Sequence, residues 1–294
     1  MSIEVAGEDA PLKAQAKGSD DKGSEGPKDH KMTDHTGIIA QQKFDIAELL
    51  FPGCVANTYK IKSDRGWDSS EMGGDFENES TWKKDKDGNK NKKLFVAQEK
   101  SECIDKICCG TYRKFDMKIW IKKKESSKGT QYNYVRPFKC SFPFFCMMCN
   151  PQELEVNDRD KNPIGKVEHD YRCVDETFCM TKWWKLTNKD GEAEYYYKQN
   201  KCCNTNLCAP SFCCHVHKID IYDKNNEITD GYLHGLFPGC SIKALLGGSL
   251  RSTYHLKFPK DASEDQRAVL MGGMFLIEYM MFEGQDKDDT VVVA

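Results

Sequence analysis

Hydrophobic and polar residues alternate in several short segments of this 294-residue chain. Residues 115–122 have the sequence FDMKIWIK, residues 217–222 have HKIDIY, and residues 254–258 have YHLKF. A period of two residues is typical of a strand with one buried and one exposed face. Turn-forming clusters follow the first two segments, at 126–129 and 223–226. The pattern therefore predicts an all-β fold, a meander of many short antiparallel strands.

Residues 268–282 break this alternation, because they are apolar at every position except Glu278. As a helix they would span ~22 Å, less than the ~30 Å hydrocarbon core of a bilayer. A lipid-facing carboxylate is costly, and the acidic residues at 264–265 suit a helix N-terminus. We therefore expect a core helix at about 267–283, inside a β-barrel, in preference to a membrane span. Its candidate membrane or core residues are Ala268, Val269, Gly272, Gly273, Phe275, Leu276, Ile277, Glu278 and Phe282.

Polar stretches suggest the domain limits. Residues 1–43 contain few large apolar residues and are expected to form a disordered tail, with structure beginning near Phe44. Residues 44–285 form the predicted barrel domain, with an exposed inserted loop at 64–91, and residues 286–294 form a C-terminal tail.

The composition adds one unusual feature, a total of 15 cysteines. No secretory signal is visible in the first 30 residues, so stable disulfides are not expected. Buried thiols, a metal site and lipid attachment remain as explanations. The net charge of −3 gives no overall attraction to nucleic acid, and we expect no nucleic-acid partner.

Several short motifs occur in a particular order. They are FVAQE at 95–99, CCG at 108–110, RPFKC at 136–140, QELEV at 152–156, PIG at 163–165, CC at 213–214, and the block 258–283. In this order they resemble the phospholipid scramblase family over about residues 45–284, interrupted at 64–91. The resemblance implies a Tubby-like closed barrel of about twelve antiparallel strands around the hydrophobic C-terminal helix. It also implies calcium-stimulated, bidirectional, ATP-independent movement of phospholipids between leaflets, without covalent catalysis, at the cytoplasmic face of a membrane, most naturally the plasma membrane.

The calcium-binding segment of that family corresponds here to residues 250–261. Calcium is bound by six to eight oxygens, usually including several carboxylates. This segment offers Ser252, Thr253 and Asp261, while Arg251 and Lys257 oppose a divalent cation. Calcium is thus implied as a cofactor by resemblance, but with a degenerate ligand set. Two other acidic segments, 158–162 and 223–227, are better explained as polar hairpin turns.

The cysteines allow two further interpretations. Cys140, Cys146 and Cys149 stand where the family has its palmitoylated cysteines, so acylation and burial as core thiols are both open. A structural zinc site is a less favoured alternative, because zinc takes four thiolate or imidazole ligands. Its candidate ligands are Cys146, Cys149, Cys213, Cys214, His215 and His217.

The expected partners are phospholipids and an anionic membrane surface. Lysine-rich runs at 83–86, 90–93 and 122–124 can attract anionic headgroups. The N-terminal tail and the 64–91 loop can also contact protein partners. Two alternative functions follow: a non-catalytic barrel that binds membrane lipid or protein, and a structural subunit of a larger assembly.

Overall fold

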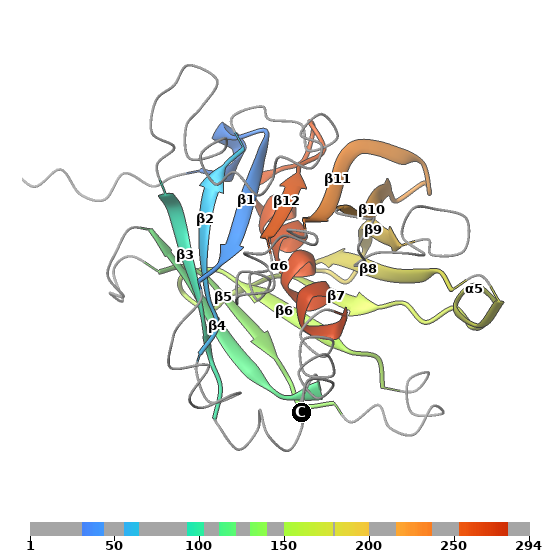
Figure 1. Ribbon diagram of the computed structural model, residues 1–294, viewed down its shortest axis with the longest axis horizontal. Coiled ribbons are helices and arrows are strands. Elements are labelled where there is room, and N and C mark those ends of the chain that lie inside the picture. Colours follow the sequence, from blue (N-terminus) through green and yellow to red (C-terminus); the bar gives the residue numbers. More distant parts are fainter. Residues whose placement is uncertain are drawn as a thin grey trace, which may run out of the picture.

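The computed structural model describes residues 31–43, 56–64, 93–102, 112–121, 130–139, 150–178, 180–199, 216–236 and 253–281. Within these ranges the chain forms a closed antiparallel barrel, in which β1 pairs with β12 and every other pair joins successive strands (Figure 1). The strands are β1 (Gly37–Gln42), β2 (Thr58–Ser63), β3 (Lys93–Lys100), β4 (Phe115–Ile121), β5 (Thr130–Arg136), β6 (Glu153–Asn157), β7 (Pro163–His169), β8 (Lys182–Asn188), β9 (Ala193–Gln199), β10 (Val216–Asp223), β11 (Ile228–Leu236) and β12 (Thr253–Lys257). The helical elements are η1 (Met32–Asp34), α5 (Cys173–Phe178) and α6 (Glu264–Met281). The predicted barrel fold is confirmed.

The three strands predicted from alternation are β4, β10 and β12. In β4 the core side chains Phe115, Met117 and Ile119 alternate with the exposed Asp116 and Lys118. Such alternation is expected where one face of a sheet packs on a core and the other meets solvent. The inner faces of all the strands converge on one hydrophobic core inside the barrel.

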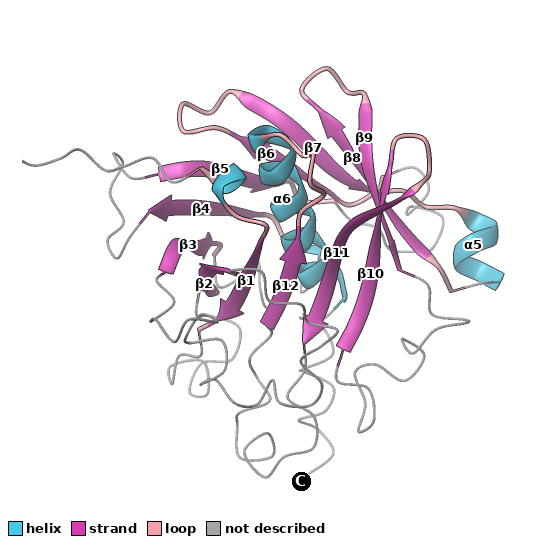
Figure 2. Cartoon of the chain, turned by 90° about the horizontal axis from the view of Figure 1, so that it is seen from above, coloured by secondary structure: helices cyan, strands magenta, loops and turns pink. Residues whose placement is uncertain are grey.

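Helix α6 fills that core (Figure 2). Its residues from Arg267 to Tyr279 are buried, so the prediction of a core helix is confirmed, with a start a few residues earlier than expected. At Gly272 and Gly273 an added Cβ would lie 2.8 Å from Val156 and 2.4 Å from the Tyr197 ring. This pair therefore lets the helix approach the strands closely. Phe282 lies outside the described residues.

Two interior tyrosines also bond to the backbone of the helix. Tyr134 donates its hydroxyl to the Ala268 carbonyl and Tyr197 donates to the Leu270 carbonyl, each at 2.9 Å. A buried hydroxyl without an acceptor is costly, so these bonds fix the helix at one depth in the barrel.

Alternating strand directions divide the loops between two ends of the barrel. The connections β1–β2, β3–β4, β5–β6, β7–β8, β9–β10 and β11–β12 all start and finish at one end. Every one of the 15 cysteines falls within these six connections. We call this the cysteine end. The other five connections between strands, including the tight hairpins β6–β7, β8–β9 and β10–β11, lie at the opposite end, which we call the hairpin end.

The expected tail boundary at residue 43 is wrong. Residues 37–42 form β1, which pairs with both β2 and β12 and so closes the barrel. The short helix η1 precedes it, and Met32 is completely buried. The alternation pattern did not reveal this strand, because β1 has only two large apolar residues, Ile38 and Ile39, beside the small Ala40. Of the predicted 64–91 loop only Asp64 is described, and residues 44–55 and 282–294 also lie outside the described ranges.

The two acidic segments at 158–162 and 223–227 form hairpin turns, as predicted. Asp158 Oδ1 accepts bonds from the backbone N–H groups of residues 160 and 162, and Asp223 Oδ1 accepts from those of 225 and 227. Asn188 does the same for residues 190 and 192. This local bonding is the usual reason for Asp and Asn at the start of turns.

Candidate functional site

The two polar ends of helix α6 and the two ends of the barrel are the features around which a function can be built. At the hairpin end, Glu264 accepts bonds from the backbone N–H groups of Met32 and Thr33, at 2.9 and 3.0 Å. Tyr132 donates its hydroxyl to the same carboxylate at 2.7 Å. Burial and this carboxylate hold the pKa of Tyr132 well above its ordinary value. The hydroxyl therefore stays protonated and remains a donor.

Arg267 completes this fixation one helical turn later. Its guanidinium donates to the carbonyls of Met32 and His35 at 3.0 and 2.6 Å, and to the Ala262 carbonyl at 2.8 Å. Burial lowers the pKa of Arg267, although a guanidinium stays charged at any physiological pH. The segment Met32–His35 is thereby fastened across the start of α6, and we call it the N-terminal strap.

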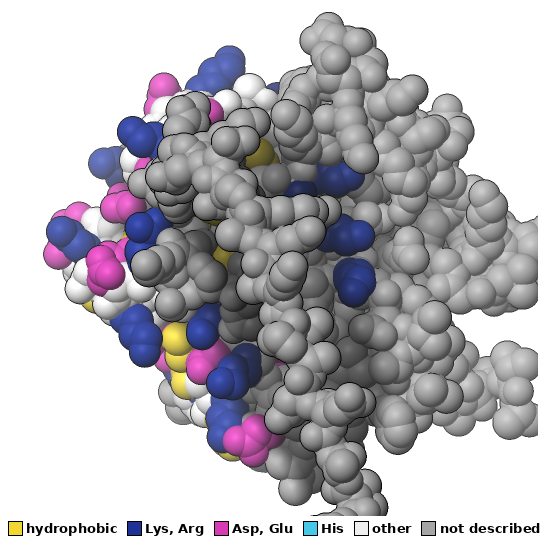
Figure 3. Space-filling view, turned by 90° about the vertical axis from the view of Figure 1, so that its left-hand side faces the viewer, with side chains coloured by type: hydrophobic (Ala, Val, Ile, Leu, Met, Phe, Trp, Pro, Cys, Tyr) yellow, Lys and Arg dark blue, Asp and Glu magenta, His cyan; other side chains and the backbone are white. Residues whose placement is uncertain are grey.

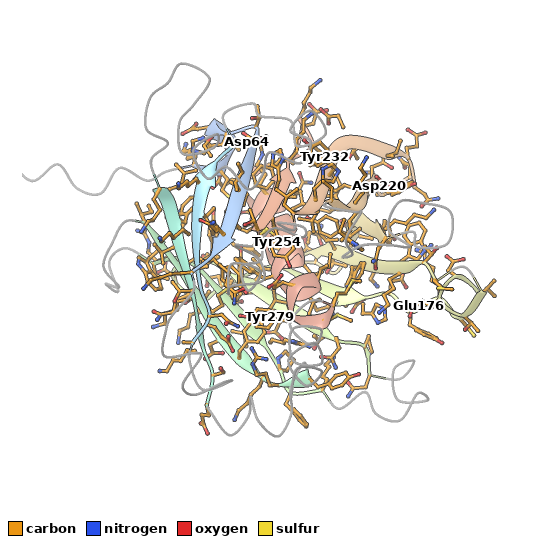
Figure 4. All side chains as sticks on the ribbon, viewed as in Figure 1. Asp64, Glu176, Asp220, Tyr232, Tyr254 and Tyr279 are labelled. Atoms are coloured by element: carbon orange, nitrogen blue, oxygen red, sulfur yellow. The ribbon has the colours of Figure 1, made fainter. Side chains whose placement is uncertain are left out.

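At the cysteine end, the last turns of α6 meet a buried ion pair. Arg113 Nε lies 3.0 Å from Glu99 Oε1, with side-chain exposures of 1% and 0%. Tyr279 donates its hydroxyl to Glu99 Oε2 at 3.0 Å, and the Asn57 amide lies 3.4 Å from that hydroxyl. Figure 4 shows Tyr279 at the opposite end of α6 from Asp64. Glu278 is also buried, with 3% exposure.

Residues of the motifs RPFKC, QELEV and PIG have structural roles in the barrel. Arg136, at the end of β5, donates to the Gln152 amide oxygen at 2.7 Å, and Gln152 donates to the Lys139 carbonyl at 2.6 Å. Together they tie the two sides of the β5–β6 connection. In β7, a Cβ added at Gly165 would lie 2.7 Å from Val269 of α6. These residues position the barrel wall and its helix.

The described part of the calcium-like segment is mostly strand. Thr253 belongs to β12, which pairs on both sides with β1 and β11, and Asp261 lies exposed in the turn that follows. Within β12, Tyr254 and Leu256 point into the core while His255 faces outward. His255 Nε2 lies 3.4 Å from Asp64 Oδ2, and Asp64 also accepts a bond from Thr36 at 2.7 Å. This geometry differs from a loop that wraps a cation. Ser252 lies outside the described residues.

The candidate acylation and zinc residues are mostly outside the described ranges. These are Cys140, Cys146, Cys149, Cys213, Cys214 and His215. His217 is described: it is buried on β10, and its Nε2 lies 2.6 Å from the Gln199 amide. In the described ranges no group of three or more His, Cys, Asp or Glu residues is arranged to hold a metal ion.

A cluster of cationic and aromatic side chains lies on the outer face of the sheet at β8, β9 and β10. Nothing in the sequence indicated this cluster. Arg172 Cζ lies 3.9 Å from the centroid of the Trp183 ring, and Lys198 Nζ lies 4.6 Å from it. Trp184, in contrast, lies in the barrel core, because neighbouring residues of a strand face opposite sides of the sheet. Lys198 stands beside Asp220 across β9 and β10. Burial raises the pKa of Asp220 above its ordinary value, although Lys198 opposes the shift.

The lysine-rich runs and the cysteines belong to different sets of connections. The runs at 83–86, 90–93 and 122–124 belong to the connections β2–β3 and β4–β5, apart from Lys93, which begins β3. The strands that flank these two connections meet them at the hairpin end. The strands between the two ends are five to nine residues long, which corresponds to roughly 20 Å.

A search for helices that could cross a membrane finds none within the described ranges. Helix α6 is the long apolar helix of that part of the chain, and it is occupied with the barrel core.

A family model for Scramblase matches residues 64–284, which include β3 to β12 and all of α6. The chain belongs to the Scramblase family. Among curated proteins, human phospholipid scramblase 2 is 24% identical over 246 residues, covering 84% of this chain and 67% of that protein. Mouse and rat phospholipid scramblase 1 are 23% and 22% identical, and the match covers 61% and 59% of their lengths. No solved structure matches this Scramblase-family chain.

Proposed function

We propose that this protein moves phospholipids between the leaflets of a membrane, in both directions, without ATP and without covalent catalysis. The observation that carries this proposal is the family match, which extends through the barrel and its internal helix. The names of the relatives, all phospholipid scramblases, support phospholipids as the substrate class. By the same reasoning the protein acts at the cytoplasmic face of a membrane, with the plasma membrane as the first candidate.

Attachment to the membrane is proposed through acylation at the cysteine end. Cys140, Cys146 and Cys149 lie in the β5–β6 connection among aromatic and methionine residues. One acyl chain gives only marginal membrane binding, whereas two give stable attachment. All the cysteines belong to connections that start and finish at one end of the barrel, so several acyl chains could enter the same bilayer.

We further propose that the activity does not depend on calcium bound at residues 250–261. The segment offers few oxygen ligands, and β12 occupies its middle. The backbone of β12 is paired with β1 and β11, so chelation there would require breaking both ladders.

The test is a fluorescent-lipid exchange assay with the purified full chain in liposomes, run with calcium and with a chelator. Equal exchange in both conditions is expected. Exchange only with calcium would overturn the calcium-independent part of the proposal. No exchange in either condition would overturn the transport proposal itself.

A second candidate is a membrane-bound barrel without transport activity. It is favoured by the way α6 is fixed at both ends and enclosed by the strands. A protein of this kind would bind the liposomes in the same assay and leave the lipid distribution unchanged.

A further inference from the structure

Four of the five exposed large hydrophobic side chains in the described ranges lie at the cysteine end. Tyr112, Phe138, Val174 and Met180 have exposed fractions of 37%, 53%, 66% and 52%. They belong to three successive connections, β3–β4, β5–β6 and β7–β8, and so follow one another along one arc of the rim. A single exposed apolar residue is ordinary on a protein surface. A succession of them along one rim is typical of a contact surface.

The β7–β8 connection holds Val174 and Met180 outward on a fixed support. Asp175 of α5 accepts a bond from Trp183 Nε1 at 2.8 Å and its carbonyl accepts from the Thr181 N–H at 2.9 Å. Glu176 lies 2.6 Å from His169. These contacts hold the polar side of α5 against the barrel. Val174 and Met180 remain exposed beside it.

We propose that the rim arc, defined as Tyr112, Phe138, Val174 and Met180, docks on the surface of a phospholipid bilayer and inserts these side chains among the headgroups. This inference rests on the proposed function for the choice of lipid as the partner. The side chains project from three separate connections. A fluid bilayer surface can accommodate apolar groups that are held apart in this way. In addition, roughly half of the residues in the six connections of the cysteine end are apolar or cysteine, against roughly one in ten at the hairpin end.

This docking fixes the orientation of the barrel. The hairpin end, with the N-terminal strap, points away from the bilayer by roughly 20 Å. That distance exceeds the Debye length of ~8 Å at physiological salt, so the described charges of the hairpin end contribute little attraction to the surface. The described face over β2–β4 carries charged side chains of both signs, with few apolar ones between them (Figure 3). Binding should therefore depend weakly on salt.

The test uses the full chain, without acylation, in a flotation assay with vesicles of phosphatidylcholine and phosphatidylserine. The double substitution Val174→Asp and Met180→Asp should reduce vesicle binding by at least about tenfold, because two inserted apolar side chains become charged. Ile228→Asp is the matched control, since Ile228 is 64% exposed at the hairpin end. Val174→Leu with Met180→Leu keeps the side chains apolar and should preserve binding.

Equal loss of binding with Ile228→Asp would overturn the inference, as would a wild-type chain that does not float with the vesicles. Thermal unfolding of each variant must match the wild type, so that misfolding is not mistaken for lost docking. A loss of about a hundredfold between low and high salt would assign binding to the basic runs and also overturn it. A chain that floats but exchanges no lipid refutes the transport proposal and leaves the docking surface supported.

Discussion

The two ends of the barrel hold the same helix by different chemistry. At the hairpin end, Glu264 and Arg267 bond mainly to backbone groups of the N-terminal strap, and Glu264 itself is only partly buried. At the cysteine end, Glu99 and Arg113 form an ion pair that is almost completely shielded from water, with Tyr279 as a third member. This difference predicts at which end water can replace a hydrogen-bond or ion-pair partner that a substitution removes. A group exposed by a substitution at the hairpin end can be hydrated, whereas a carboxylate left alone inside the cysteine end cannot.

The largest effect should therefore come from Arg113→Met. It leaves the Glu99 carboxylate buried without its cation, which costs about 3–5 kcal/mol in the free energy of unfolding. Urea unfolding followed by circular dichroism measures this loss. The double variant Glu99→Gln with Arg113→Met should recover most of the stability. A single variant as stable as the wild type would show that water reaches this pair.

A substitution between the two ends should have an intermediate effect. At Gly273→Val the new side chain would collide with the Tyr197 ring, since even a Cβ would lie 2.4 Å from that ring. Overpacking of this kind costs about 1–3 kcal/mol, visible as a lower melting temperature. Met274→Leu in the same buried turn changes the volume little and is the control. If the two variants melt together, the close approach at Gly273 is not needed.

At the hairpin end, Glu264→Ala removes the acceptor for the Met32 and Thr33 amides and for Tyr132. We expect a loss of about 1–2 kcal/mol, because the strap can still bond to water and to Arg267. Hydrogen exchange should speed up at Met32 and Thr33 while the amides around Glu99 keep their protection. Faster exchange at both ends would mean that the helix moves as one unit with the strap.

The smallest effect concerns the turn at Asp158. Its slight burial would raise the pKa of the carboxyl, but hydrogen bonds from Asn162, Asp160 and Lys161 outweigh this and hold the pKa below its ordinary value of 3.8. A lowered folded pKa gives stability that is present above the unfolded value and is lost as the pH falls. Asp158→Asn should reduce that acid dependence by well under ~1 kcal/mol, since the site is exposed. Unfolding at about pH 6 and about pH 3 measures it.

The fold of the turn should survive this change, because Asn188 already supports the equivalent β8–β9 hairpin through the same two backbone bonds. A marked loss of stability of Asp158→Asn at neutral pH would show that the negative charge itself is needed.

Much of the fold could be predicted from the sequence because its signals are local. The alternation in 115–122 and the apolar run after residue 268 each report burial along one element. The strand β1 was missed because its six residues give a weak signal beside polar neighbours. Helix α5 was missed because its six residues show no helical period.

The contacts of the candidate site were harder to predict, because they join distant residues. Nothing near Glu99 or Arg113 in the sequence indicates that they pair with each other beside Tyr279. The assignment of all the cysteines to connections of one end could nevertheless have been predicted from the sequence. In a meander, every second connection returns to the same end, and all 15 cysteines fall in alternate connections.

The closure of the barrel between β1 and β12 has a consequence for biosynthesis. The contacts that complete the fold join Met32 to Glu264 and Gly37 to Lys257, more than 200 positions apart. A ribosome makes all twelve strands before it makes the helix that fills them, so the emerging barrel must remain open until α6 has left the ribosome. Contacts of such long sequence separation slow folding. During synthesis, the apolar inner faces of the strands are therefore exposed to chaperones for as long as the helix is missing.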